Sequence, residues 1–148
     1  MAKVRVTKVF RFEMAHALDG YEGLCKNIHG HSYVFSVTVL GEPMQEEGNP
    51  ENGLVVDFGD LKKIVNENVV NHFDHALILK ETSPFLKSLD KTLNERLITT
   101  PYQPSCENLL LHFIEIIRPL FPNNLQLVSA RLNETQNSYA EWLLSDQN

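Results

Sequence analysis

The pattern that most constrains this fold is a pair of strand-like segments near the start of the sequence, joined by a loop with three glycines. The first segment covers residues 4–12 and reaches His16, and the second covers about residues 32–40. Both are rich in β-branched and aromatic side chains, which favour strands over helices. A hairpin of these two strands would lay His16 beside the start of the second strand.

Two helices are expected next, followed by two final strands. Asp57 is placed to cap the first helix, with Asp60 three residues on as in a capping box. Ser105 is placed to cap the second, whose wide apolar face ends before Pro119. Residues 125–132 and 139–144 have the composition of strands, and residues 135–138 that of a turn.

This order of elements, strand-strand-helix-helix-strand-strand, predicts an α+β fold. We expect a four-stranded antiparallel sheet with both helices on one face. Residues 80–104 contain three prolines and mixed charge, so we expect an irregular segment on the surface with at most a short helix. No repeat or domain boundary is evident, and 148 residues suit a single domain covering 1–148.

The net charge and the apolar windows exclude several classes of partner. A formal charge of -6 argues against broad binding to nucleic acid or to an anionic membrane. A phosphorylated small molecule needs only a local basic pocket and stays compatible with this charge. The most apolar window, NLLLHFIEIIRPLF, is too short and too charged to span a bilayer, and the first residues do not have the features of a signal peptide.

Three histidines are the strongest functional signal. Alternate residues of a strand share a face, so His29 and His31 point the same way if the strand begins near His29. Gly30 between them lets other groups come close, and the hairpin would add His16. Three imidazoles with one open position are the usual ligand set of catalytic zinc. Iron, nickel or copper would also accept imidazole.

The two cysteines, Cys25 and Cys106, have different interpretations. Cys25 could be a fourth ligand of a closed structural site, or a reactive thiol whose pKa is lowered by a nearby cation. The glycine-bearing loop around it favours the catalytic role. Cys106 starts a helix and is expected to be a small packed residue. Two cysteines make no disulfide framework, which favours a reducing cytoplasm.

Six short motifs together resemble the 6-pyruvoyltetrahydropterin synthase family. They are FRFEMAHAL, CKNIHGHSY, GLVVDFGDLK, FDHALIL, PSCENL and LNET, and they run from residue 10 to residue 135. Within that family the chain looks most like the bacterial 6-carboxytetrahydropterin synthases. The resemblance implies a tunnelling fold, which agrees with the predicted order of elements. It also implies one zinc ion per chain, held by His16, His29 and His31.

The resemblance implies a role for five further residues. Cys25 would be the catalytic thiol that acts as a general base, and Asp74 with His75 would form a second acid/base pair. Glu134 would anchor the pterin ring, whose guanidine-like edge offers N–H donors that one carboxylate can accept in pairs. Glu107 would line the same pocket. Cys106 departs from the small or hydroxylic residue usual in its motif.

The implied reaction converts 7,8-dihydroneopterin triphosphate into 6-carboxytetrahydropterin, acetaldehyde and triphosphate, a step toward queuosine. The alternative is 6-pyruvoyltetrahydropterin synthase, which removes triphosphate but keeps the three-carbon side chain. Cys25 argues against a branch that carries Glu at this position. An alternative of another class is a non-enzymatic metal-binding module with Cys25 as fourth ligand. The triphosphate site is not assigned, and Lys26 is one of many candidates.

The composition of the first and last strands predicts that several copies of the chain assemble into an oligomer. The first and last strands carry little protection against pairing with another chain, and closing strands of several subunits into a barrel removes such edges. The family resemblance implies trimers stacked in pairs, so we expect a homohexamer. We also expect a pocket shared by Cys25 of one subunit and Glu134 of another, since ligand sites favour interfaces.

Overall fold

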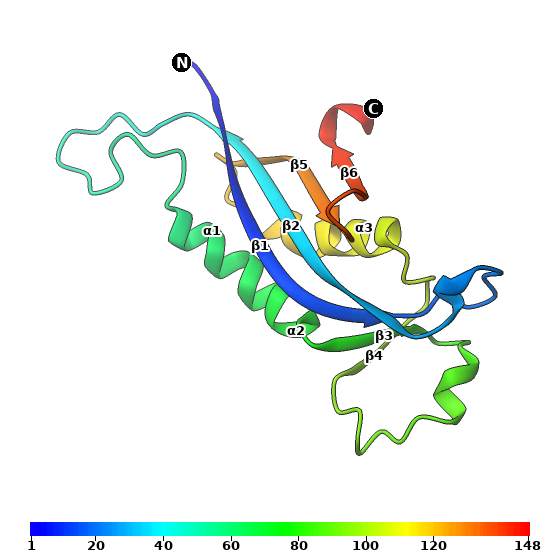
Figure 1. Cartoon of the computed structure of the whole chain (residues 1–148). Helices are drawn as coiled ribbons and strands as arrows, with labels where there is room; N and C mark the ends of the chain where they lie inside the picture. Colours follow the sequence, from blue (N-terminus) through cyan, green and yellow to red (C-terminus); the bar gives the residue numbers. More distant parts are fainter.

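The two long N-terminal strands form the centre of the sheet (Figure 1). In the computed structural model, which describes residues 1–148, β1 (Val4–His16) and β2 (His29–Gly41) are antiparallel along their whole length. β5 (Gln126–Asn133) pairs antiparallel with β2, and β6 (Tyr139–Leu143) pairs antiparallel with β5. These four strands confirm the two hairpins expected from the sequence.

The sheet is larger than predicted, because two short parallel strands extend it beyond β1. β3 (Ala76–Lys80) runs parallel to the end of β1, and β4 (Leu97–Thr100) runs parallel to β3. The result is a mixed, six-stranded sheet in the order β4-β3-β1-β2-β5-β6. The prediction of a four-stranded antiparallel sheet was therefore wrong. Strands of five and four residues are too short for a periodic pattern to distinguish them from loop.

Both predicted helices are present on one face of the sheet, behind β1 and β2 in Figure 1. The first stretch consists of α1 (Phe58–Val65), a π-helical turn (Asn66–Val70) and α2 (Asn71–Phe73). The Asp57 side chain caps it by accepting a hydrogen bond from the Gly59 N–H at 2.6 Å. Ser105 caps α3 (Cys106–Ile117) by accepting from the Asn108 N–H at 3.2 Å. Both predicted caps are confirmed.

Four short 3-10 turns complete the chain: η1 (Leu24–Lys26), η3 (Pro84–Lys87), η4 (Arg118–Leu120) and η5 (Leu144–Asp146). The turn η3 is the short helix expected between residues 80 and 104. The rest of that segment is not only an irregular surface segment as predicted, because it contributes β4 to the sheet. None of the helices has both the length and the apolar character needed to cross a lipid bilayer.

The core lies between the sheet and the helices and is built from alternate strand residues. The buried side of β1 carries Phe10, Phe12 and Met14, and the same side of β2 carries Tyr33 and Phe35. These side chains pack against the apolar faces of the helices, which include Leu61, Val65, Leu109, Phe113 and Ile117. The same alternation continues to the end of β1 and the start of β2, which are paired with each other. There, the side chains on the core-facing side of the sheet are polar instead of apolar.

Candidate metal centre and active site

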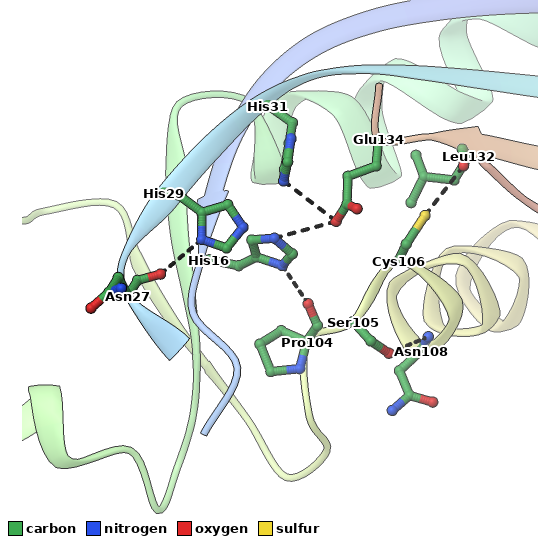
Figure 2. A network of polar contacts seen from close by, with 10 residues as sticks. All are labelled: His16, Asn27, His29, His31, Pro104, Ser105, Cys106, Asn108, Leu132 and Glu134. Atoms are coloured by element: carbon green, nitrogen blue, oxygen red, sulfur yellow. Dashed lines mark hydrogen bonds and ion pairs between the residues drawn. The ribbon is translucent and has the colours of Figure 1, made fainter. Parts of the chain in front are cut away.

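Three imidazoles meet where β1 ends and β2 begins (Figure 2). His16 is directly opposite His29 in the strand pairing, and His31 lies two residues further along β2 on the same face. The ring centroids are 4.6 Å apart for His16 and His29, and 4.9 Å apart for His29 and His31. The strand geometry therefore brings together the three histidines singled out by the sequence.

Main-chain carbonyls orient two of these rings. The Nδ1–H of His16 donates to the carbonyl oxygen of Pro104 at 2.6 Å, and the Nδ1–H of His29 donates to that of Asn27 at 2.7 Å. A neutral ring that donates through Nδ1 keeps a lone pair on Nε2. Nε2 of His29 and Nε2 of His31 are buried and have no hydrogen-bond partner. Such orientation of an imidazole by a carbonyl is typical of metal ligands.

This donor set fits a metal ion. One nitrogen from each of the three rings lies within 4.8 Å of the others. Burial lowers the pKa of His16 and of His31, although the nearby Glu134 carboxylate acts in the opposite direction. Both rings therefore favour the neutral form, which is the form that binds a metal. His16, His29 and His31 could hold one metal ion between them.

Glu134 approaches the same point from just beyond β5 (Figure 2). Its Oε1 lies 3.3 Å from Nε2 of His16 and 3.5 Å from Nε2 of His31. If His16 donates through Nδ1, its Nε2 lone pair faces a carboxylate oxygen, and two acceptors repel each other unless a proton or a cation lies between them. The carboxylate thus adds to the case for a cation at this position.

Tyr33 is a residue of this centre that the sequence did not reveal. Its side chain is fully buried, its ring centroid is 5.5 Å from that of His31, and its hydroxyl makes no well-formed hydrogen bond. Burial and the negative charge of Glu134 raise the pKa of Tyr33 well above its usual value. The sequence feature that could have revealed Tyr33 is its position two residues after His31, which places both side chains on the same face of β2.

Asp74 and His75 form a pair at the start of β3. Asp74 Oδ1 lies 3.0 Å from Nδ1 of His75 and accepts a hydrogen bond from the Glu13 N–H at 2.9 Å. His75 has a positive φ of 61° and donates its own N–H to the Glu13 carbonyl at 2.6 Å. The edge of β1 thus holds the pair in place, and 72% of the His75 side chain stays exposed.

The electrostatics of this pair favour an ionised Asp74. Partial burial raises its pKa, but the hydrogen bonds from Glu13 and His75 and the charge of Arg96 outweigh this effect and hold the pKa below its usual value. A hollow of about 290 Å³ lies beside the pair, and His75, Gly30 and His31 are among the residues that line it.

Arg96 supports the Asp74–His75 pair, and no sequence pattern indicated this role. Its Nε–H donates to the Asp74 carbonyl at 2.9 Å, and its Nη2–H donates to the carbonyls of Asn71 and His72 at 2.8 and 3.0 Å. Arg96 therefore satisfies the carbonyls at the end of α2, as cations do at helix C-termini. No local pattern connects residues so far apart in the chain.

The remaining predicted residues lie outside the imidazole cluster. Cys25 is half-buried in η1, and its thiol is not among the metal-ligating atoms that converge. Glu107 is exposed on the first turn of α3, and its side chain makes no hydrogen bond or ion pair. Cys106 is packed as expected, since its Sγ–H donates to the Leu132 carbonyl at 3.2 Å, and burial raises its pKa to about 11.

The sequence matches the family model of 6-pyruvoyl tetrahydropterin synthase over residues 5–143. The chain belongs to this family. It is 32% identical to the 6-carboxy-5,6,7,8-tetrahydropterin synthase of Haemophilus influenzae over 141 residues, which are 93% of this chain and 97% of that protein. It is 28% identical to the enzyme of the same name from Rickettsia typhi, over 93% of this chain and 99% of that protein.

Solved structures agree with this family membership at the level of the fold. A protein from Wolinella succinogenes superposes with a TM-score of 0.77 at 18% identity, covering 97% of this chain and 99% of its own. The 6-pyruvoyl tetrahydropterin synthase of Caenorhabditis elegans gives a TM-score of 0.68 at 23% identity, covering 97% and 96%. The family's tunnelling fold is thus confirmed, and the chain is a lyase of the pterin synthase family.

Proposed function

We propose that this chain is a 6-carboxytetrahydropterin synthase. It would convert 7,8-dihydroneopterin triphosphate into 6-carboxytetrahydropterin, acetaldehyde and triphosphate, a step toward queuosine and other 7-deazapurines. The observation that carries the proposal is the convergence of the three imidazoles beside Glu134. The names of its relatives from H. influenzae and R. typhi support this product over others of the family. In this proposal residues 1–148 act as one catalytic domain.

Zinc is the proposed ion, with one ion per chain bound by His16, His29 and His31. Three nitrogen donors with room for further ligands are typical of catalytic zinc. The carbonyls of Pro104 and Asn27 support the assignment, because they leave Nε2 of two rings free to coordinate. When bound, zinc would polarise the oxygens of the substrate side chain.

Cys25, Asp74 and His75 would move the protons. We assign Cys25 as the general base that removes a proton from a side-chain carbon of the substrate. Asp74 holds Nδ1–H of His75, which leaves Nε2 of that ring to accept or donate a proton at the exposed side. The exposed ring of His75 supports a role of this pair in proton transfer to a bound substrate.

Glu134 and Glu107 would bind the pterin. The two oxygens of Glu134 can accept two N–H groups of the guanidine-like edge of the ring. Its distance of 3.3 Å from His16 would keep the bound ring next to the metal. For Glu107 the support is the resemblance of the PSCENL motif alone, since its side chain is exposed on α3.

The proposed assembly is a homohexamer of two stacked trimers in the cytoplasm. Its support is the unpaired backbone at the sheet edges. β6 is one edge of the sheet, and β3 pairs with β1 only at residues 14–16, so most of β1 is open on that side. Open strands of this kind favour pairing with another chain.

The decisive experiment is product analysis after incubation of the zinc-loaded protein with 7,8-dihydroneopterin triphosphate. Acetaldehyde and the mass of 6-carboxytetrahydropterin are the expected products. A 6-pyruvoyl product without acetaldehyde would instead identify 6-pyruvoyltetrahydropterin synthase. If the zinc-loaded protein consumes no substrate and zinc protects Cys25 from alkylation, the chain is a metal-binding module. The matched control is Cys25→Ala, which should keep zinc and lose turnover.

A further inference from the structure

The loop that carries Cys25 has few hydrogen bonds to the rest of the molecule. Residues 17–28 form turns among themselves, such as the bond from the Leu18 N–H to the Cys25 carbonyl at 2.9 Å. At the end of the loop, the Asn27 carbonyl accepts from the neighbouring His29. The other hydrogen bonds between the loop and the rest of the molecule all involve one residue, Asp19.

Gln103 makes two of these bonds and pairs with Asp19 in both directions. The Asp19 N–H donates to Oε1 of Gln103 at 2.9 Å, and Nε2–H of Gln103 donates to the Asp19 carbonyl at 2.7 Å. Both groups are partly buried. A side-chain amide that pairs twice with one peptide fixes the distance and the orientation of that peptide. Asp19 adjoins Leu18, which is itself bonded to Cys25.

The backbone of Gln103 is fixed independently of this pair. Its carbonyl accepts from the Asn108 side chain at 2.9 Å and from the Ser105 N–H at 2.8 Å, at the start of α3. The next residue, Pro104, is buried, and its carbonyl accepts from Nδ1 of His16. Two consecutive residues therefore hold a metal-centre imidazole on one side and the Cys25 loop on the other.

We propose that Gln103 is a positioning residue, which fixes the Cys25 loop relative to the metal-binding imidazoles. The inference rests on the proposed function in so far as Cys25 is taken as the base. The connection runs from α3 through Gln103 to Asp19, and through Leu18 to Cys25. Loss of the Gln103 side chain would release the loop but leave the Pro104 carbonyl, and so His16, in place.

Three variants separate this role from general destabilisation. Gln103→Leu removes both side-chain bonds at similar size, and Gln103→Glu keeps the acceptor oxygens but loses the donor. Thr82→Val is the matched control, because Thr82 donates to the Asp19 carboxylate at 2.8 Å and its loss leaves the Gln103 pair intact. Circular dichroism and the bound metal per chain establish that each variant is folded. Gln103→Glu decides the question if Gln103→Leu does not fold.

The readout is the rate at which iodoacetamide alkylates Cys25, followed by peptide mass mapping without substrate. We expect an increase of about tenfold for Gln103→Leu and one at least as large for Gln103→Glu, because its carboxylate would face the Asp19 carbonyl. For Thr82→Val we expect an increase of less than about twofold. Metal content should stay at the wild-type level in all three. In turnover, kcat should fall in the same order while KM changes by less than about twofold.

An alkylation rate in the folded Gln103 variants within about twofold of wild type would overturn the proposal. An equal increase in Thr82→Val would do so too, because it would show general loosening of the loop. The alkylation measurements need no substrate, so they test the positioning role of Gln103 even if the wild-type protein shows no synthase activity. In that case only the proposed function fails.

Discussion

Oε1 of Glu134 lies 3.3 Å from Nε2 of His16, on the side of the ring away from the Pro104 carbonyl. The hydrogen bond to Pro104 uses Nδ1–H, so the neutral ring turns an acceptor toward the carboxylate. A metal ion held by the three imidazoles would remove this repulsion and would be attracted by the nearby negative charge. Glu134 is thus expected to influence metal affinity as well as substrate binding.

The first prediction is that Glu134→Gln weakens metal binding by about 10- to 100-fold, the usual effect of losing a group next to the ligands. The wild-type chain should bind about one metal ion, and His29→Ala or His31→Ala should abolish binding. Metal content after dialysis and competition with a chelator measure these effects. Glu107→Gln is the matched control, since this carboxylate makes no contact with the imidazoles, and its affinity should be unchanged.

The second prediction concerns pH and the metal-free protein. Burial lowers the pKa of His16 and of His31 from the usual 6.5. Below pH 6.5 the unfolded chain therefore binds protons that the folded chain does not, so acid favours unfolding. The free energy of unfolding should fall as pH drops from 6.5 toward the lowered pKa values, and these two groups should add no slope above 6.5.

Denaturant unfolding of the metal-free protein at several pH values tests this dependence. His31→Gln removes one of the two titrating rings, so its stability should fall less steeply with acid than that of the wild type. A stability that is flat between pH 7 and pH 5, or one that rises with acid, contradicts the lowered pKa values.

The third prediction distinguishes the two thiols. Burial raises the pKa of Cys106 to about 11, and its Sγ–H is bonded to Leu132, so it should stay protonated and unreactive near pH 8. Cys25 is half-buried in a loop. Iodoacetamide should therefore label one cysteine in the native protein, which peptide mapping identifies as Cys25, and both after unfolding. Labelling of Cys106 in the native protein would be the contrary result.

The sequence predicted the centre of the sheet well but missed its extension. The long alternating strands, the caps at Asp57 and Ser105 and the shared face of His29 and His31 are local patterns, and all were visible in the sequence. β3 and β4 were missed, because such short strands are defined by their neighbours in the sheet. Arg96 and Gln103 act through hydrogen bonds between segments far apart in the chain, which no local pattern encodes.

The fourth prediction compares two buried or half-buried tyrosine hydroxyls. The Tyr33 hydroxyl makes no well-formed hydrogen bond, whereas the Tyr102 hydroxyl is hydrogen-bonded to Nδ1 of His112. The Tyr33 hydroxyl has only the nearby Glu134 carboxylate and no well-formed hydrogen bond, so Tyr33→Phe should change the free energy of unfolding by less than about 1 kcal/mol. Tyr102→Phe should lower it by about 1 kcal/mol, because it leaves His112 without its partner. Denaturant unfolding of both variants at neutral pH gives the comparison.

The last prediction concerns which residues come from different subunits. The sequence suggested that Cys25 and Glu134 meet across an interface. In the structure, Glu134 lies against His16 of its own chain, and residues 103–104 connect His16 to the loop of Cys25. The His75 side chain, by contrast, is 72% exposed, and a proton-transfer group works best where water is excluded. We therefore expect a second subunit to cover His75.

Mixing two inactive variants tests this arrangement. Chains with Cys25→Ala and chains with His75→Ala should regain activity when unfolded and refolded together, because some interfaces then combine an intact Cys25 with an intact His75 of the other chain. Cys25→Ala mixed with Glu134→Ala is the matched control and should stay inactive, because we expect both residues to come from the same chain's half of the site. Recovery in the control mixture alone would restore the arrangement suggested by the sequence. A fully active monomer in sedimentation would exclude any shared site.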